Sequence, residues 1–254
     1  MSPSHGPGQP GSPTAFDGLV EDYDAARPSY PDELFAALPP LAGTAVVELG
    51  SGTGISTRAL LGRGARLVAT DLGPKVLRHN VNRSPGLRAM VARAEQLPLR
   101  DGVADLVCGA QMWHWVDAAA AAREVVRVLR PGGALAVWWN EVNAIGVPWW
   151  DAQQDRLEAA NPRYTRGYRE QDYGADLRAT GLFRSVDAPV RIPWSRELDL
   201  DTYLAWLRSK SYVDAIRRPA YDEFLAAEAA SLTSVFPSGV ITEPFVTTLW
   251  IARR

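Results

Sequence analysis

The sequence of 254 residues predicts an α/β fold, in which helices cover both faces of a mostly parallel β-sheet. Short apolar runs alternate with helical segments from residue 32 to about residue 140, which is the pattern of successive strand–helix units. One run, at residues 46–49, leads into a glycine-rich loop. The next run ends in Asp71, about 20 residues beyond the glycines. Both features are typical of parallel strands whose carboxyl ends meet at one edge of a sheet.

The loop after the first strand favours a cofactor site. Residues 46–54 read V-V-E-L-G-S-G-T-G, so a buried strand containing Glu48 ends in three alternating glycines. Glycine adopts positive φ readily, and because it lacks Cβ a ligand can approach its backbone closely. The dinucleotide fingerprint G-x-G-x-x-G would need a small residue where Ile55 stands, and the G-K-[S/T] of a P-loop is missing. A plain glycine-rich turn is the alternative interpretation.

The next two strands bring further polar groups to the same edge of the sheet. Residues 66–71 form the second strand, and Asp71 has the position at which α/β nucleotide-binding folds place a carboxylate that accepts hydrogen bonds from ribose hydroxyls. A role in capping the helix near Pro74 is the alternative. A third run, residues 87–91, is followed by Ala94 and Glu95.

The remaining elements extend the alternating pattern and then depart from it. Residues 103–111 predict a fourth strand that ends at Gln111, and residues 112–117 read M-W-H-W-V-D. A helix and a Pro-Gly-Gly turn at 131–133 precede a fifth strand, 134–139. Beyond it the sequence predicts helices at 148–160, 199–209 and 219–235 and strands at 184–194 and 245–252.

Several of these motifs, in this order, resemble those of class I S-adenosylmethionine (SAM)-dependent methyltransferases. Residues 48–54 resemble the first motif of that family, E-x-G-x-G-x-G, and residues 94–98 resemble its A-E-x-L-P segment. Residues 23–31 resemble the Y-x-x-x-R-P-x-Y-P opening of a small-molecule subgroup, the UbiE-like and trans-aconitate-methyltransferase-like enzymes. Residues 110–117 resemble the A-Q-x-x-H-W-F-D segment of the same subgroup, with Val116 in place of its phenylalanine.

The resemblance implies a Rossmann-like class I methyltransferase fold with a seven-stranded, mostly parallel sheet. An antiparallel hairpin of residues 184–194 and 245–252 would close the sheet, and the helices between them would form a lid. The implied cofactor is SAM, with its methionine part over the glycine loop, its ribose at Asp71 and its adenine beside Ala94 and Glu95. The residues expected to bind it are Tyr23, Arg27, Glu48, Gly50, Ser51, Gly52, Gly54, Asp71, Ala94, Glu95 and Gln111.

Aromatic residues near the ends of the fourth and fifth strands are the candidates for the substrate side. Aromatic walls shape an apolar pocket and attract a sulfonium through cation–π interactions, although strand-end tryptophans also fill cores. The expected substrate-binding residues are Tyr30, Trp113, Trp115, Trp139 and Trp149. In the pair Trp138-Trp139, alternation along the strand sends the two rings to opposite faces.

Two polar residues are candidates for catalysis and cofactor anchoring. His114, just beyond the fourth strand, could deprotonate a nucleophile near neutral pH, and a structural histidine packed between tryptophans is the alternative. The fork of Arg27 could hold the SAM carboxylate, and a surface arginine before a proline is the alternative. The three histidines share no ligand spacing, so no metal site is expected.

Composition limits the other function classes. With a net charge of −2 and no basic stripe, a nucleic-acid surface is not expected. No apolar run approaches the ~18 residues of a membrane span, and the single cysteine, Cys108, indicates a cytoplasmic, reducing setting. Residues 1–14 predict a disordered tail, and residues 15–254 predict a single domain with a core at 32–140 and a lid and C-terminal strands at 141–254. A monomer or homodimer is expected.

The function expected from these observations is methyl transfer from SAM to an O, N or C atom of a small, apolar or aromatic metabolite. Two alternatives stay open at this point: a small carboxylic-acid O-methyltransferase of the trans-aconitate type, and a non-catalytic SAM-binding module. An NAD-dependent oxidoreductase of similar topology is less favoured, because Ile55 breaks the dinucleotide fingerprint.

Overall fold

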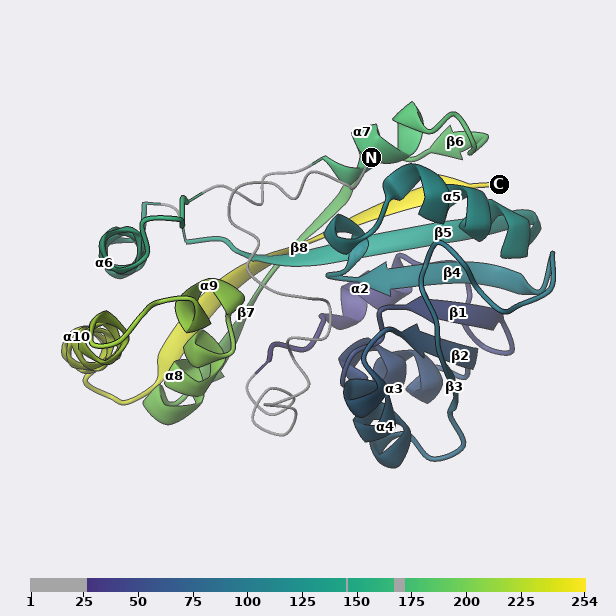
Figure 1. The fold of residues 1–254 in the computed structure, drawn as a ribbon. Helices are drawn as coiled ribbons and strands as arrows, with labels where there is room; N and C mark the ends of the chain where they lie inside the picture. The colour runs from purple at the N-terminus through teal and green to yellow at the C-terminus, as the bar shows by residue number, and fades with distance from the viewer. Residues whose placement is uncertain (1–26, 145, 167–171) are drawn as a thin grey trace.

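The computed structural model describes residues 27–144, 146–166 and 172–254. Their strands form one mixed sheet in the order β3-β2-β1-β4-β5-β8-β6, and β7 also pairs with β8 (Figure 1). The strands are β1 (Ala45–Leu49), β2 (Arg66–Asp71), β3 (Arg88–Val91), β4 (Ala104–Ala110), β5 (Leu129–Val142), β6 (Ser185–Val186), β7 (Val190–Leu198) and β8 (Ile241–Arg253). The helices are α2 (Asp32–Ala36), α3 (Ile55–Gly62), α4 (Pro74–Arg83), α5 (Ala118–Val128), α6 (Pro148–Ala160), α7 (Tyr173–Ala179), α8 (Leu200–Arg208), α9 (Ser211–Asp214) and α10 (Ala220–Val235).

The first five strands are parallel, and the last part of the sheet is antiparallel. In the parallel part β1 lies between β2 and β4, with Val47 opposite Val68 on one side and Val107 on the other. The predicted Rossmann-like arrangement, a mostly parallel sheet closed by antiparallel C-terminal strands, is confirmed. Because parallel strands end together, the loops after β1, β2, β3 and β4 meet at one edge.

Alternation along the strands divides the core between the two faces of the sheet. On one face Val46, Leu106 and Trp138 pack against residues of α2 and α3. On the other face Val47, Val107 and Trp139 pack in a cluster that includes residues of α5 and α7. The strands are apolar on both faces because helices cover both faces.

The single strand predicted at residues 184–194 is divided into two strands in the structure. The expected range 184–194 contains β6 and the start of β7, and both pair antiparallel with β8. Pro189 lies between them, and since proline has no N–H to donate, it interrupts the ladder. The sheet therefore has eight strands among the described residues, although they fill seven positions across it.

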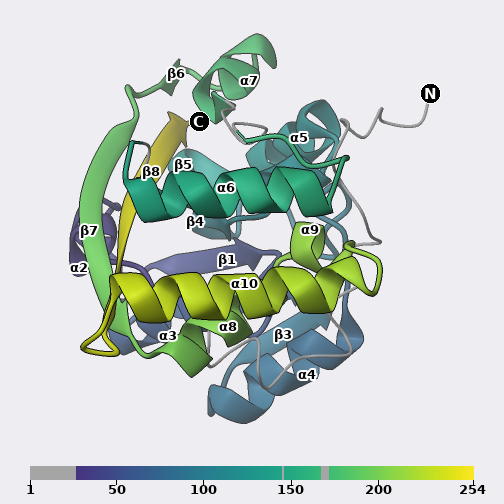
Figure 2. The same ribbon diagram turned by 90° about the vertical axis from the view of Figure 1, so that its left-hand side faces the viewer.

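Strands β5 and β8 are longer than predicted, and this length positions the lid. Their pairing continues to Val142 opposite Phe245, and β7 follows β8 to Leu198 opposite Ile241. The helices α6, α8, α9 and α10 lie together at this projecting end of the sheet (Figure 1). Figure 2 shows α6 and α10 side by side across it. A third apolar cluster, which includes Tyr203, Leu207 and Phe224, joins these helices to Phe245.

The turn at residues 131–133 lies inside β5 instead of before it. Leu129 pairs with Ala104 and Ala134 pairs with Leu106, so the extra residues of β5 form an irregularity. A Cβ on Gly133 would lie 3.0 Å from the carbonyl oxygens of Arg130 and Asp105, which explains the glycine there.

Among the described residues, no helix is both long enough and apolar enough to cross a membrane.

Candidate cofactor and substrate site

The glycine loop forms a tight connection between β1 and α3. Gly50, Gly52 and Gly54 have φ of 58°, 53° and 92°, the left-handed region that favours glycine. Gly54 is the residue before the first turn of α3, and a Cβ there would lie 2.0 Å from Oδ1 of Asn80. The loop can therefore pack against α4 only because this position carries no side chain.

Glu48, on β1, stabilises this loop through hydrogen bonds to α3. Its carboxylate is fully buried and accepts hydrogen bonds from the hydroxyls of Ser56 and Thr57, the latter at 2.5 Å, both on α3. Asn80 of α4 donates to Thr57 Oγ1 at 2.9 Å, which links β1, α3 and α4 in one buried network. Burial raises the pKa of Glu48 to about 7, although the two hydroxyl donors act in the opposite direction.

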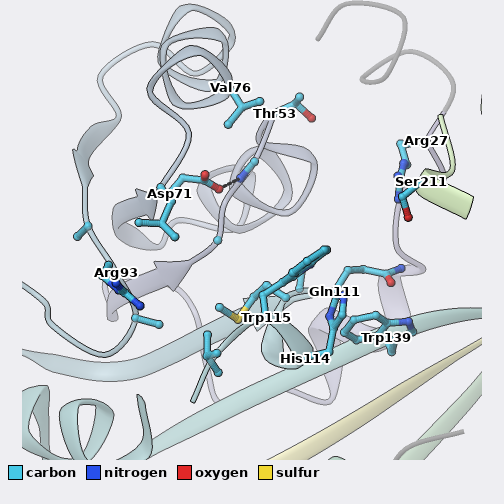
Figure 3. Close-up of a pocket in the computed structure, with 18 of the residues that line it drawn as sticks. Arg27, Thr53, Asp71, Val76, Arg93, Gln111, His114, Trp115, Trp139 and Ser211 are labelled. Atoms are coloured by element: carbon cyan, nitrogen blue, oxygen red, sulfur yellow. Dashed lines mark hydrogen bonds between the residues drawn. The ribbon is translucent and has the colours of Figure 1, made fainter. Parts of the chain in front are cut away.

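Asp71 connects the end of β2 to the glycine loop. Its two carboxylate oxygens accept hydrogen bonds from the backbone N–H of Gly52 and of Gly73, each at 2.8 Å. The bond from Gly52 is drawn in Figure 3. A carboxylate has about four acceptor positions, so these bonds orient it without exhausting its capacity to accept from a ligand. Asp71 and Gly52 both line a cavity of about 260 Å³ at the carboxyl edge of the sheet.

The wall of this cavity that contains Asp71 continues to the loop after β3. Ala94 is buried, and Glu95 accepts a hydrogen bond from the backbone N–H of Asp117 at 3.0 Å. Apolar side chains form the walls between these residues and Asp71, namely Leu72, Val76, Ala92 and Val116. This part of the cavity has the form of an apolar slot with acidic groups beside it.

The end of β4 supplies the opposite wall. Gln111 has a φ of 58°, the positive-φ exception among the described non-glycine residues, and its Nε2 donates to the carbonyl oxygen of Asn140 at 3.4 Å. Strained backbone of this kind is concentrated at functional sites. The imidazole of His114 lies between the rings of Trp115 and Trp139, with centroid distances of 4.6 and 4.7 Å.

The lid closes the cavity with residues that the sequence did not single out. Trp206 of α8, Lys210 and Ser211 line it together with Arg27. Figure 3 shows Arg27 and Ser211 near each other and on the far side of the cavity from Asp71. Arg27 donates from Nη2 to the carbonyl oxygen of Ser209 at 3.1 Å, which ties the N-terminal segment to the lid.

Most of the residues expected from the sequence lie around this cavity. Those that line it are Arg27, Gly50, Gly52, Asp71, Ala94, Glu95, Gln111, His114, Trp115 and Trp139. Glu48, Ser51 and Gly54 do not line it, but they form or support the loop that does. Tyr23 lies outside the described residues.

Three of the expected substrate residues lie elsewhere. Tyr30 packs edge-on against Trp138, on the opposite face of the sheet from Trp139, and Trp113 is buried in the cluster under α5. Trp149 lies in the lid core against Tyr203 and Phe236, because α6 presents this side chain to α8 and α10 and not to the cavity. Trp206 and Lys210 were missed because helical periodicity identifies an apolar face without showing what that face covers.

Comparison with known proteins identifies a methyltransferase-domain segment in the chain. Residues 47–137 match the family model for a methyltransferase domain, and this stretch contains the glycine loop, Asp71 and Gln111. This stretch of the chain therefore resembles the methyltransferase domain of class I, SAM-dependent enzymes. A solved structure, that of a proposed type II methyltransferase from Anaeromyxobacter dehalogenans, superposes with a TM-score of 0.68 at 27% identity, over 89% of this chain and 97% of that one.

Curated relatives match about half of this chain. An uncharacterized methyltransferase of Mycobacterium tuberculosis is 45% identical over 126 residues, which are 50% of this chain and 52% of that protein. The malonyl-[acyl-carrier protein] O-methyltransferase of Dechloromonas aromatica is 34% identical over 131 residues, 47% of this chain and 49% of that one. The chain therefore spans about half the length of the curated relatives it matches.

No cluster of His, Cys, Asp and Glu in the described ranges could hold a metal ion.

Proposed function

We propose that this protein transfers a methyl group from SAM to a small molecule bound under the lid. The observation that carries the proposal is the convergence of Gly52 and Asp71 on one wall of a cavity that Trp115, Trp139 and Trp206 also line. The cofactor supplies an electrophilic methyl group on a sulfonium. The role of the protein is then to hold that group and the acceptor in line, which can contribute effective molarities of about 10⁵–10⁸ M.

The residues present fit the cofactor. The side-chain-free backbone at Gly50 and Gly52 leaves room for the methionine part, and the Asp71 carboxylate suits the two donors of a ribose diol. Ala94 and Glu95, with the apolar slot of Leu72 and Val76, suit the adenine ring. In this arrangement Arg27, across the cavity, would bind the SAM carboxylate.

The acceptor would lie at the aromatic end of the cavity. Trp115, Trp139 and Trp206 line it there, and Trp139 is itself stacked on Tyr173 with an interplanar angle of 28°. These walls favour a small, apolar or aromatic acceptor, and their ring faces stabilise a nearby sulfonium. His114 lies where it could accept a proton from a hydroxyl or amine acceptor.

A carboxylic acid as the methylated group is the second candidate. Arg27 and Lys210 line the cavity, and one of the relatives is named a malonyl-[acyl-carrier protein] O-methyltransferase. A carboxylate acceptor is already ionised, so His114 would not be needed as a base. A non-catalytic SAM-binding module, a cytoplasmic location and a monomeric or homodimeric state remain predictions.

Incubation with SAM and a panel of acceptors tests the proposed function. Phenols, aromatic amines and small carboxylic acids would be supplied separately, and release of S-adenosylhomocysteine would be followed by mass spectrometry. Turnover with phenols or amines supports the first candidate, and turnover with carboxylic acids alone supports the second. Binding of SAM without any release would favour the non-catalytic module, whereas binding of NAD in place of SAM would contradict the assignment of the site.

Replacing Asp71 with asparagine is expected to weaken S-adenosylhomocysteine binding about 10- to 100-fold. The amide cannot serve both backbone donors and a ribose diol as acceptor, and a hydrogen bond to a charged group contributes about 1.5–3 kcal/mol. The measurement is calorimetric titration of wild type and variant. Asp101→Asn is the matched control, because that carboxylate is exposed and lies outside the cavity. Equal affinities of the Asp71→Asn variant and wild type would exclude Asp71 from the ribose site.

A further inference from the structure

A short segment before α2, residues 27–31, is held against β5, and we call it the strap. The ring of Tyr30 packs edge-on against that of Trp138, with a centroid distance of 5.9 Å. Two residues further along β5, on the same face, Nδ2 of Asn140 donates a hydrogen bond to the carbonyl oxygen of Ser29 at 2.9 Å. Two side chains of one strand therefore hold the strap, whose first residue lines the cavity.

A chain of hydrogen bonds across the sheet orients the amide of Asn140. On β7, Nε1 of Trp194 donates to Oγ1 of Thr247 on β8 at 2.8 Å, and this hydroxyl donates to Oδ1 of Asn140 at 2.6 Å. In the opposite orientation the amide oxygen would face the carbonyl oxygen of Ser29, and neither atom has a proton to donate. The amide nitrogen therefore faces the strap.

Burial makes this orientation matter. Asn140 and Thr247 are both buried, and a buried polar group that loses its hydrogen bond costs free energy. The side chain of Asn140 does not line the cavity, and its main-chain oxygen accepts the bond from Gln111 that any substitution would leave in place. The amide of Asn140 can therefore act on a ligand only through the strap that it holds.

The strap extends from Asn140 to the lid. Nη2 of Arg27 donates to the carbonyl oxygen of Ser209, and its guanidinium carbon lies 5.1 Å from the ring centroid of Trp206. Figure 3 shows Arg27 across the cavity from Asp71. Since Arg27 is two residues from the strap carbonyl that Asn140 holds, a reach of at most about 7 Å, a shift of that carbonyl displaces Arg27 as well.

We propose that Asn140 is a positioning residue, which seats the strap so that Arg27 meets the cofactor opposite Asp71. The proposal rests on the proposed function, in which Arg27 binds the SAM carboxylate, and it adds a residue that touches neither cofactor nor acceptor. Loss of the amide should release the strap and let Arg27 visit other positions. Binding of the carboxylate then weakens, because a binding group must be held in its productive geometry by the residues behind it.

Two ligands that differ in their amino-acid part test the proposal. The full chain is titrated calorimetrically with S-adenosylhomocysteine and with 5′-methylthioadenosine, which has the same adenine and ribose but no carboxylate. Asn140→Ala is expected to bind S-adenosylhomocysteine at least tenfold more weakly than wild type and 5′-methylthioadenosine less than threefold more weakly. Arg27→Gln should give the same pattern. If Asn140 acts through Arg27, the double variant should bind S-adenosylhomocysteine within threefold of Arg27→Gln alone.

Thr247 allows a second test in which Asn140 is kept. Thr247→Val removes the hydroxyl that orients the amide and should weaken S-adenosylhomocysteine binding at least threefold, whereas Thr247→Ser keeps the hydroxyl and should bind like wild type. Asn143→Ala is the matched control and should bind both ligands like wild type, because this asparagine is exposed, directly follows β5 and does not line the cavity. The pair of Thr247 variants decides the proposal if Asn140→Ala is unstable.

Several results would overturn the proposal. One is an affinity for S-adenosylhomocysteine within threefold of wild type in Asn140→Ala, and another is an equal loss for both ligands, which would assign Asn140 to the stability of the whole site. Losses that multiply in the double variant would show that Asn140 and Arg27 act independently. If wild type binds neither ligand, the proposed function is wrong and this inference falls with it. If wild type binds both and only the variants depart from these results, this inference alone is wrong.

Discussion

Replacing Gly54 with alanine is expected to lower the melting temperature by about 6–12 °C. Alanine must adopt a φ of 92°, which costs about 1–2 kcal/mol, and overpacking typically adds about 1–3 kcal/mol. The new Cβ would lie 2.0 Å from Oδ1 and 2.5 Å from Cγ of Asn80. Asn80 cannot readily move, because it is fully buried and bonded to Thr57 and Ser84. A loss of about 3 kcal/mol or more corresponds to this shift in a domain of this size.

Gly52→Ala is the matched variant. It should have a small effect on the melting temperature and a large effect on S-adenosylhomocysteine binding. Gly52 also has positive φ, but no atom lies within 4 Å of its added Cβ, so the melting temperature should fall by less than half as much. Gly52 lines the cavity and donates to Asp71, so its side chain would meet the cofactor. We expect S-adenosylhomocysteine affinity to fall more than tenfold in Gly52→Ala.

Thermal melts without ligand and titrations at low temperature, where both variants are folded, separate the two effects. If Gly54→Ala melted like wild type, the packing of the loop against α4 would be wrong. If Gly52→Ala bound S-adenosylhomocysteine normally, the cofactor would not lie over this loop.

The parallel half of the fold, and the meeting of Gly52 and Asp71 at one cavity, could be predicted from the sequence because their signals are local. An apolar run, a glycine loop and an acid at a fixed spacing place Gly52 and Asp71 together once parallel strands are assumed. Strand alternation likewise separates Trp138 from Trp139. Each inference needs only neighbouring residues and the geometry of one element.

The helices of the lid could be predicted from the sequence, but the side chains that they present to the cavity could not. The helix at residues 148–160 is observed with these bounds, yet Trp149 faces the lid core and not the cavity. Which face of α8 meets the cavity depends on how far β5, β7 and β8 project. Their length is set by pairing between residues that lie 43–59 positions apart for β7 and β8 and 103–119 positions apart for β5 and β8. The residues that neighbour Trp206 and Lys210 in the sequence therefore do not show that these two side chains line the cavity.

Glu48 should give the stability of this protein a pH dependence opposite to that of most carboxylates. Its pKa is about 7 in the folded chain, because burial disfavours the charge, against 4.5 when solvated. Between these values the folded state holds a proton that the unfolded state has released. Stability from this group is therefore fully present below pH 4.5 and is lost as the pH rises through 7.

The comparison with Glu48→Gln isolates this effect. The amide does not titrate, so the stability of wild type relative to the variant should fall by about 2.5 kcal/mol between pH 5 and pH 8. Urea unfolding of both proteins at several pH values measures the difference, with other titrating groups common to both. A constant difference would show that Glu48 titrates alike in the folded and unfolded chains.

Thr57→Val provides a second check on the pH dependence of stability, because it should raise the pKa of Glu48. The hydroxyl of Thr57 donates to Glu48 and favours its ionised form, so the variant should raise the pKa of Glu48 further. The loss of stability should then extend to higher pH than in wild type. A shift to lower pH would mean that this hydroxyl does not donate to the carboxylate, and the buried support of the glycine loop would need another arrangement.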